Sequence, residues 1–340
     1  MAQYKAKDIA KVLQISTAAV SLAINDKPGI SEATRQKVFD YLRQLGADEM
    51  IPQRSAAISR NLALVIYRKY DKHNVPYVEH SFLAQLMEGI NQACRKFGYN
   101  LLVTYVVKQT SFEAATANIE QCDGFIILAT EMFTEDLAGF IPTGRPFIVL
   151  DSYFEKFDFD CIVINNVQGA YAATTHLVRQ GHRKIGYLKS NLTINNFLER
   201  FEGYRKALNT YDLTFDSSSV FVLGSGIDSS YLAMKEYMTE KPDLPTAFFA
   251  ENDQLALGAI KAFKEAGLRV PEDISVIGFD NLALAEVSEP GLSTVNVPKE
   301  QMGLLAIERL VSKIRERRSE FVKIEIGTNL VERASVRKLN

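Results

Sequence analysis

From Leu62 onward, short apolar segments alternate with longer segments that repeat apolar residues at helical spacing. The apolar segments suit buried strands and lie at 62–67, 100–107, 124–128, 147–150, 161–164, 184–188, 246–250 and 274–279. Helical patterns lie between them, for example at 82–97, 169–180, 254–266 and 301–314. This alternation predicts an α/β fold of doubly wound parallel sheets with helices on both faces. The region is large enough for two such lobes.

The N-terminal 45 residues have a different pattern, which predicts three short helices between residues 7 and 45. Ser16 is suited to cap the second helix and Ser31 the third. Residues 5–25 also fit a helix-turn-helix. Ala10 is small where the two helices must approach, and Ile15 is apolar at the turn between them. The second helix of such a unit presents its N-terminal residues to base edges in the major groove.

The segment KAKDIAKVLQISTAAVSLAIN, residues 5–25, resembles the N-terminal signature of the lactose-repressor/galactose-repressor family of transcriptional regulators. Residues 30–38, ISEATRQKV, resemble the third helix of that family's headpiece. Three segments of the large region resemble the family's effector domain, which is similar to periplasmic sugar-binding proteins; they are 169–188, 200–208 and 248–281. The resemblance covers essentially the whole chain and is weakest at 46–61 and 210–230.

The resemblance implies a helix-turn-helix headpiece at 1–46, a linker or hinge at 47–61 and an effector-binding and dimerisation core at 62–340. The core would consist of two lobes of the periplasmic-binding-protein type. We expect the first lobe at about 62–161 and 293–321, and the second at about 162–292 and 322–340.

Carried onto this sequence, the base-reading positions of the family are Thr17, Ala18 and Leu22. Four further residues would contact phosphates or hold the recognition helix: Ser16, Ser21, Asn25 and Thr34. Many family members have Arg where this chain has Leu22, and Arg is the commonest reader of guanine. Leu22 can instead pack on a thymine methyl group, or it can face the headpiece core.

The linker also departs from the family pattern, because it has no Tyr and Gln53 follows Pro52. Ile58 is the best available residue for the minor-groove wedge that the family uses. The alternative is that Ile58 packs against the core.

The ligand of this family lies in the cleft between the lobes, where polar residues follow the carboxyl ends of parallel strands. On the resemblance, the expected effector contacts are Tyr67, Asp151, Arg200, Asn252 and Asp280. Arg200 offers a fork of N–H donors to adjacent hydroxyls or a carboxylate. Arg200 and Asp280 can also be a structural ion pair, and Asn252 can serve only as a helix cap.

The sequence contains no motif that indicates catalysis, metal or cofactor binding, secretion or membrane insertion. It shows no Gly-x-Ser-x-Gly, His-Glu-x-x-His, P-loop or Cys-x-x-Cys motif, so we expect no enzyme, metal or cofactor. Its three cysteines are widely spaced and suit a reducing cytoplasm. No signal peptide or membrane segment is visible.

Residues 1–60 carry nine Lys and Arg against six Asp and Glu, whereas the remainder of the chain carries 30 Lys and Arg against 35 Asp and Glu. A mildly basic N-terminal part is compatible with DNA contact.

The sequence therefore predicts a transcriptional regulator that binds double-stranded operator DNA under the control of a small molecule, expected to be a carbohydrate. We expect a homodimer, because the C-terminal residues leave no room for the leucine heptads by which some members form tetramers. Two alternatives stay open. One keeps the DNA function with a phosphoprotein or nucleobase as co-effector, and the other is a sugar-binding protein without a regulatory role.

Overall fold

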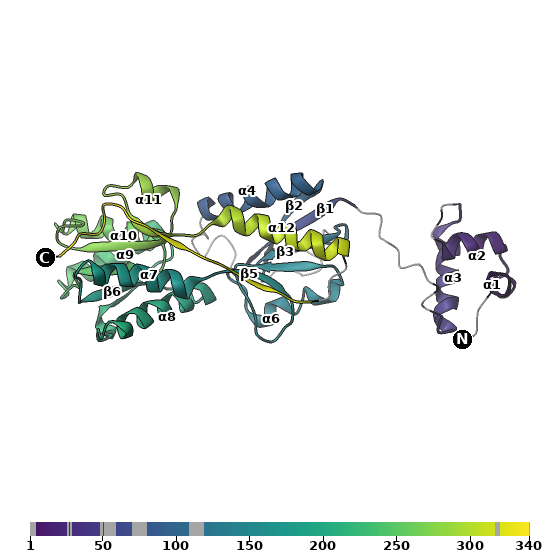
Figure 1. Cartoon of the computed structure of the whole chain (residues 1–340), viewed down its shortest axis with the longest axis horizontal. Helices are drawn as coiled ribbons and strands as arrows, with labels where there is room; N and C mark the ends of the chain where they lie inside the picture. The colour runs from purple at the N-terminus through teal and green to yellow at the C-terminus, as the bar shows by residue number, and fades with distance from the viewer. Residues whose placement is uncertain are drawn as a thin grey trace. The chain divides into compact units, whose positions relative to one another are not determined.

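The computed structural model describes residues 5–25, 27, 29–47, 50, 59–69, 80–108, 119–316 and 320–339. It divides the chain into two compact units, Met1–Ser59 and Arg60–Asn340. The first unit corresponds to the predicted headpiece with its linker, and the second to the predicted core (Figure 1).

The described residues of the first unit form three α-helices, α1 (Ala6–Leu13), α2 (Thr17–Ile24) and α3 (Glu32–Gln44). The side chain of Ser16 accepts a hydrogen bond from the backbone N–H of Ala19 at 3.0 Å, and that of Ser31 accepts one from Thr34 at 3.2 Å. Both predicted N-caps are therefore confirmed. The helices enclose a small apolar core whose fully buried members include Val20, Ala23, Val38 and Leu42.

Arg35 fastens α3 to the end of α2. Its side chain is buried, with 5% of the residue exposed, and it donates to the backbone carbonyls of Leu22 at 3.2 Å and Lys27 at 2.6 Å. These carbonyls lie near the C-terminal end of α2, where backbone carbonyls have no N–H partner within the helix. The guanidinium supplies the missing donors. This arrangement fixes the orientation of the predicted recognition helix within the headpiece.

The first lobe of the core is built on a six-stranded parallel sheet of order β11-β5-β4-β3-β1-β2. Its strands are β1 (Asn61–Arg68), β2 (Asn100–Val107), β3 (Gly124–Leu128), β4 (Phe147–Leu150), β5 (Asp160–Ile164) and β11 (Lys323–Ile326). Its helical segments are α4 (His80–Phe97), α6 (Thr134–Leu137), η2 (Ile141–Thr143) and α12 (Lys299–Glu316). Helices α4 and α12 pack side by side on one face of the sheet (Figure 1).

The second lobe has a six-stranded sheet of order β12-β10-β9-β8-β6-β7, in which only the β10–β12 pair is antiparallel. The strands are β6 (Ile185–Ser190), β7 (Val220–Leu223), β8 (Ala247–Ala250), β9 (Ser275–Asp280), β10 (Ser293–Asn296) and β12 (Asn329–Val331). The helices are α7 (Asn166–Arg179), α8 (Asn195–Thr210), η3 (Ser217–Ser219), α9 (Ile227–Thr239), α10 (Asp253–Glu265) and α11 (Ala283–Val287).

Successive residues of the central strands point to opposite faces of each sheet, and the two faces pack in separate apolar clusters. In β8, Phe249 packs in the cluster that includes residues of α7 and α8, whereas Phe248 packs in the cluster that includes residues of α10. Both residues are fully buried. Continuous apolar strands with helices on both faces are the expected architecture of a parallel sheet, so the predicted fold class is confirmed.

The chain passes between the lobes three times, and each crossing lies a few residues later than we expected. β5 continues to Ile164 in the first sheet, β10 completes the second sheet at Asn296, and β11 returns to the first sheet until Ile326. The expected lobe boundaries near 161, 292 and 321 are corrected accordingly. The reason is that β5, β10 and β11 each complete their ladder of hydrogen bonds before the chain leaves the sheet.

Candidate functional site

The N-terminal half of α2 is exposed on the headpiece. Ser16, Thr17 and Ala18 are exposed, and Ser21 and Asn25 are exposed on the same helix. Asn25 donates from its side-chain amide to the backbone carbonyl of Ser21 at 2.8 Å, so it helps to terminate the helix. An exposed helix of this kind, supported by two others, has the geometry of a major-groove reader.

Leu22 is half-buried and is absent from the apolar cluster of the headpiece. Its Cδ1 lies 3.4 Å from the position that a Cβ would take on Gly29, so it borders the loop after α2. Thr34 is also half-buried, and its hydroxyl lies 2.7 Å from that of Ser31. Ile58, the expected wedge, lies outside the described residues.

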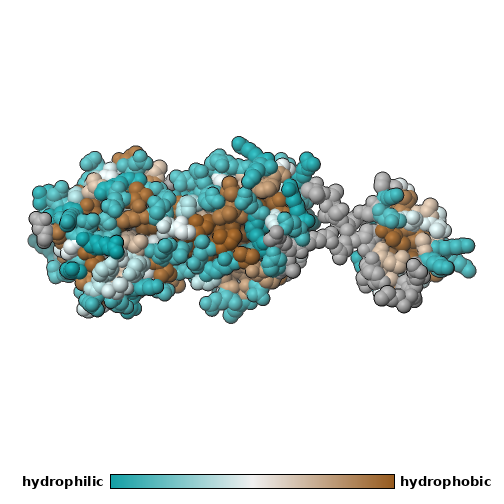
Figure 2. Space-filling view, viewed as in Figure 1, coloured by the Kyte–Doolittle hydropathy of each residue, from teal (hydrophilic) through white to brown (hydrophobic). Residues whose placement is uncertain are grey.

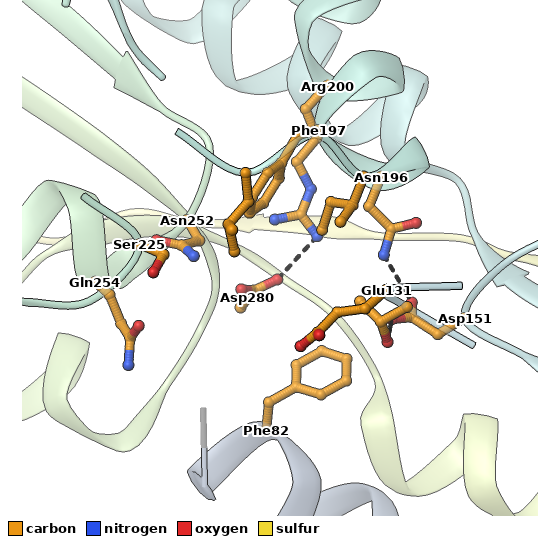
Figure 3. Close-up of a pocket in the computed structure, with 13 residues that line it drawn as sticks. Phe82, Glu131, Asp151, Asn196, Phe197, Arg200, Ser225, Asn252, Gln254 and Asp280 are labelled. Carbon is orange, nitrogen blue, oxygen red and sulfur yellow. Dashed lines mark hydrogen bonds and ion pairs between the residues drawn. The ribbon is translucent and has the colours of Figure 1, made fainter. Parts of the chain in front are cut away.

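A cavity lies between the two lobes of the core, at the carboxyl ends of β4, β8 and β9 (Figure 3). The space measures about 640 Å³, including the part that is open to solvent. The first lobe contributes Phe82, Thr130, Glu131 and Asp151, and the second contributes Leu192, Ile194, Asn196, Phe197, Arg200, Ser225, Asn252, Gln254 and Asp280. Four of the five predicted effector contacts therefore line one cavity.

Arg200, on α8, is the central cation of this cavity and only 2% of the residue is exposed. Its Nε donates to Asn166 Oδ1 at 2.9 Å, Nη1 to the carbonyl of Glu251 at 2.5 Å, and Nη2 to Asp280 Oδ1 at 3.0 Å. The guanidinium also stacks 3.7 Å from the ring centre of Phe279. Among the described residues, one N–H on each terminal nitrogen remains for a ligand, and the fork is held rigidly toward the cavity.

Asp280 ends β9 with a φ of 106°, a backbone conformation that residues other than glycine rarely adopt. The buried ammonium of Lys299 donates to its carbonyl at 2.5 Å and to that of Val297 at 3.2 Å. Burial raises the pKa of the Asp280 carboxyl, while Arg200 and Lys299 act in the opposite direction. Lys299 begins α12 of the first lobe, so the conformation of this site residue is held from both lobes. Backbone strain at such a position is typical of binding sites.

Asp151 follows β4 and also adopts a positive φ, of 66°. Its Oδ2 accepts from the hydroxyl of Thr130 at 2.6 Å, and its Oδ1 accepts from the amide of Asn196 at 2.9 Å. Burial raises the pKa of this carboxyl to about 6, although both hydrogen bonds favour the ionised form. The Asp151 carboxylate thus accepts one hydrogen bond from each lobe.

Asn252 has both of the roles considered from the sequence. Its Oδ1 accepts from the backbone N–H of Leu255 at 2.9 Å and caps α10, while the residue lines the cavity. Its amide group is the part that can face a ligand.

Tyr67 is not where we expected it. It is buried in the apolar cluster on the other face of the first sheet, with Ala63 and Val65, and is absent from the lining of the cavity. The reason is the two-residue period of strand β1: Leu62, Leu64 and Ile66 share one face, so Tyr67 points to the opposite one.

The sequence reasoning missed Glu131, Asn196 and the two phenylalanines of the cavity, Phe82 and Phe197. Thr130 and Glu131 follow β3 as Asp151 follows β4, so the rule about carboxyl ends of strands could have found them. Phe82 and Asn196 lie in the first turns of α4 and α8, where no local signal distinguishes them.

Two further carboxyl groups lie buried behind the cavity. Glu251 accepts from the hydroxyl of Tyr187 at 3.0 Å and from the backbone N–H of Ser190 at 2.5 Å, and burial raises its pKa to about 8. Burial likewise raises the pKa of Asp253 well above its ordinary value.

In the described residues, no group of three or more His, Cys, Asp or Glu side chains is arranged to hold a metal ion. No helix in the described part of the chain combines the length and apolarity needed to cross a membrane.

Two protein families match this chain. Residues 5–46 match the family described as "Bacterial regulatory proteins, lacI family", and residues 174–336 match "Periplasmic binding protein-like domain". These matches cover the recognition helix and most of the second lobe.

Among curated proteins, the chain is 32% identical to the HTH-type transcriptional repressor PurR of Aliivibrio salmonicida, over 98% of this chain and 99% of that protein. It is 29% identical to the ribose operon repressor of Haemophilus influenzae, over 98% of each.

Among solved structures, the complex of the transcriptional regulator CelR with cellobiose matches with a TM-score of 0.72 at 27% identity, over 98% of this chain and 100% of that one. A LacI family transcriptional regulator from Enterococcus faecium with bound ribose matches with a TM-score of 0.71 at 26% identity, over 82% and 100%.

Proposed function

Because the chain belongs to the LacI family of bacterial regulatory proteins, we propose that it represses transcription by binding an operator. We further propose that a carbohydrate bound between the core lobes sets the affinity of the protein for this operator. The family membership makes it a DNA-binding repressor with a ligand-binding core rather than an enzyme. The carbohydrate, the dimer and the cytoplasmic location, where its operator DNA lies, are the parts that we propose.

The observation that carries the proposal is the buried pair of Arg200 and Asp280 in the cavity wall. Together they present N–H donors beside a carboxylate, and Asp280 Oδ2 has no hydrogen-bond partner among the described residues. Adjacent hydroxyl groups of a sugar each donate one hydrogen bond and accept another, so they match this combination. Phe82 adds an apolar surface for the C–H face of a sugar ring (Figure 3).

A nucleobase is the second candidate for the effector. The rings of Phe82 and Phe197 line the cavity together with the amides of Asn252 and Gln254, and a planar heterocycle would use both. A thermal-shift screen with sugars, sugar phosphates and nucleobases separates the candidates, because a ligand that binds the folded state raises the melting temperature.

For the homodimer, the support is an apolar surface on the first lobe that a second copy of the chain would cover. Figure 2 shows hydrophobic side chains gathered on the face of the core that carries α4 and α12. Edge strand β2 next to α4 exposes Leu102, Val103 and Tyr105, at 40%, 41% and 54%. Exposed apolar edges of this kind are usually covered by a partner. A two-fold dimer would then bind a pseudo-palindromic operator, one headpiece per half-site.

The test of the regulatory role needs the full-length chain, since the core alone would behave as a sugar-binding protein. Fluorescence anisotropy with DNA from upstream of its own gene is expected to show saturable binding that a screened effector shifts. Ligand binding without any specific DNA binding would favour the sugar-binding protein without a regulatory role.

A further inference from the structure

Carboxylates outnumber cations on the wall of the cavity between the lobes. Glu131, Asp151 and Asp280 line it, and Arg200 is the one Lys or Arg among its described lining residues. Figure 3 shows the three carboxylates converging from different elements on the same space. The cavity therefore offers many hydrogen-bond acceptors and few donors to a bound molecule.

Two cations beside this cavity, Arg200 and Lys299, already face acceptors of the protein, and a third, Arg68, forms an ion pair with Glu131 at 3.2 Å. Arg200 donates to Asp280 at 3.0 Å, to the Glu251 carbonyl and to Asn166. Lys299, behind the cavity, donates to the carbonyls of Asp280 and Val297. An anionic ligand would thus have to compete with a carboxylate that is already in place.

Glu131 lies where the cavity between the lobes meets a second, smaller hollow. It lines both this cavity and an adjoining hollow formed with Lys69, Asn191, Leu192, Thr193 and Ile194. Its Oε1 accepts from Arg68 Nη1 at 3.2 Å, and its Oε2 accepts from the backbone N–H of Lys69 at 3.1 Å. These bonds fix the carboxylate at the junction, and its side chain is 16% exposed.

We propose that the effector of this site is an uncharged molecule rich in hydroxyl or N–H donors, and that Glu131 determines this specificity by excluding phosphorylated forms. The inference rests on the proposed function, because it concerns the ligand of the same cavity. A hydroxyl beside Glu131 donates to its carboxylate, whereas a phosphate chiefly offers acceptors and would have to displace Glu131 from its ion pair with Arg68 or face the carboxylate.

The experiment compares matched pairs of ligands on the full-length protein at constant ionic strength. The pairs are ribose with ribose 5-phosphate, glucose with glucose 6-phosphate, fructose with fructose 1-phosphate, and adenine with AMP. Melting temperatures identify binders and calorimetry gives their affinities. For any pair that binds, we expect the uncharged member to bind about 100-fold more tightly than the phosphorylated one. Tighter binding of a phosphorylated member overturns the proposal.

Glu131→Gln tests the residue itself, and Glu135→Gln, at an exposed glutamate four positions later, is the matched control. Gln keeps the shape and a carbonyl acceptor but removes the charge that faces Arg68. Glu131→Gln should reduce the discrimination against the phosphorylated member at least tenfold, while Glu135→Gln leaves it unchanged. Equal discrimination in all three proteins would remove Glu131 from the specificity of the site.

Inorganic phosphate serves as a bare anion and gives an answer even if no organic compound binds. The rise in melting temperature on replacing chloride with phosphate should be larger for Glu131→Gln than for the wild type and for Glu135→Gln. An equal rise in the three proteins contradicts the proposal. Operator binding is measured on the same preparations, so that a failure of the regulatory role is seen separately from a failure of this ligand specificity.

Discussion

Asn196 donates a hydrogen bond from its side-chain amide to Oδ1 of Asp151, 2.9 Å away, although the two residues belong to different lobes. The neighbouring Asn195 crosses the same boundary and donates to Ser152 Oγ and to the carbonyl of Tyr153, each at 3.3 Å. The start of α8 is therefore attached to the residues that follow β4. Any ligand-driven change in the angle between the lobes must alter these contacts.

Asn196→Ala should lower the stability of the core by about 1–3 kcal/mol, because it leaves one oxygen of a buried carboxylate without its donor. Thermal and urea unfolding of the full chain measure the effect. Asn209→Ala, at an exposed position on the same helix, is the control and should change stability by less than about 0.5 kcal/mol. Equal effects of the two substitutions would show that the contact between the lobes contributes nothing.

The buried carboxyl of Glu251 predicts a pH dependence of stability. Burial raises its pKa to about 8 in the folded state, so folding favours the protonated form. Its contribution to stability is complete below the unfolded pKa, near 4.5, and is lost as the pH rises through the folded value. Glu251→Gln, which stays neutral, should flatten the fall in unfolding free energy between pH 6 and 8. The wild type should lose up to about 1.4 kcal/mol per pH unit more than this variant. Parallel pH profiles would contradict the assignment.

Arg200 should be replaced by Lys as well as by Ala to test its role in effector binding. Arg200→Ala leaves Asp280 buried without its ion-pair partner, which costs about 3–5 kcal/mol and can unfold the core. Arg200→Lys keeps the positive charge but loses the fork of N–H donors. We expect Arg200→Lys to retain operator binding and to weaken the effector about 100-fold, measured by anisotropy and calorimetry. A folded Arg200→Lys protein with normal effector affinity would show that the pair is only structural.

Leu22 gives a prediction about the operator. Since Leu22 is outside the apolar cluster of the headpiece, Leu22→Arg should fold, and it should shift preference toward guanine at one symmetric position per half-site. The expected change is about 1–3 kcal/mol at that base pair, with little effect at well-separated positions. Selection from random DNA, with circular dichroism of both proteins, measures it. An unchanged consensus from a folded variant would exclude Leu22 from base reading.

The dimer is tested at edge strand β2. Val103→Asp places a charge on an exposed apolar edge and should shift sedimentation from dimer to monomer at micromolar concentration. Val222→Asp, on edge strand β7 of the other lobe, is the control, because that side chain is 46% exposed as well. The monomeric form of Val103→Asp should also lose most of its operator affinity, since each copy contacts only half a site.

Apolar periodicity predicted the strands that consist almost wholly of apolar residues, including edge strand β2. It did not find β7, β10, β11 and β12. β11 reads Lys-Ile-Glu-Ile and β12 is three residues long, so neither forms a recognisable apolar run. β10, with the sequence Ser-Thr-Val-Asn, buries a single apolar residue, Val295, beside the hydrogen-bonded Ser293 and Thr294, so it forms no apolar run. Strands of this kind form because they pair with adjacent strands of the sheet, and their own sequences carry no clear signal.

The site was predictable where a polar residue directly follows a strand, as with Asp151, or ends one, as with Asp280. The error at Tyr67 arose because its position at the end of β1 was considered without the face to which it points. The bond between Asn196 and Asp151 was beyond sequence reasoning, since it depends on how two lobes that are separate in the chain approach each other.

On the proposed function, a ligand in the cavity controls the affinity of the headpiece for DNA. The most direct measurement titrates full-length protein onto its operator by fluorescence anisotropy, with and without an effector found in the thermal-shift screen. We predict that a saturating effector changes the operator Kd about 5- to 150-fold, and that operator DNA changes the effector Kd by the same factor. An effector that binds the core but leaves the operator Kd unchanged would show that the cavity and the headpiece are not coupled.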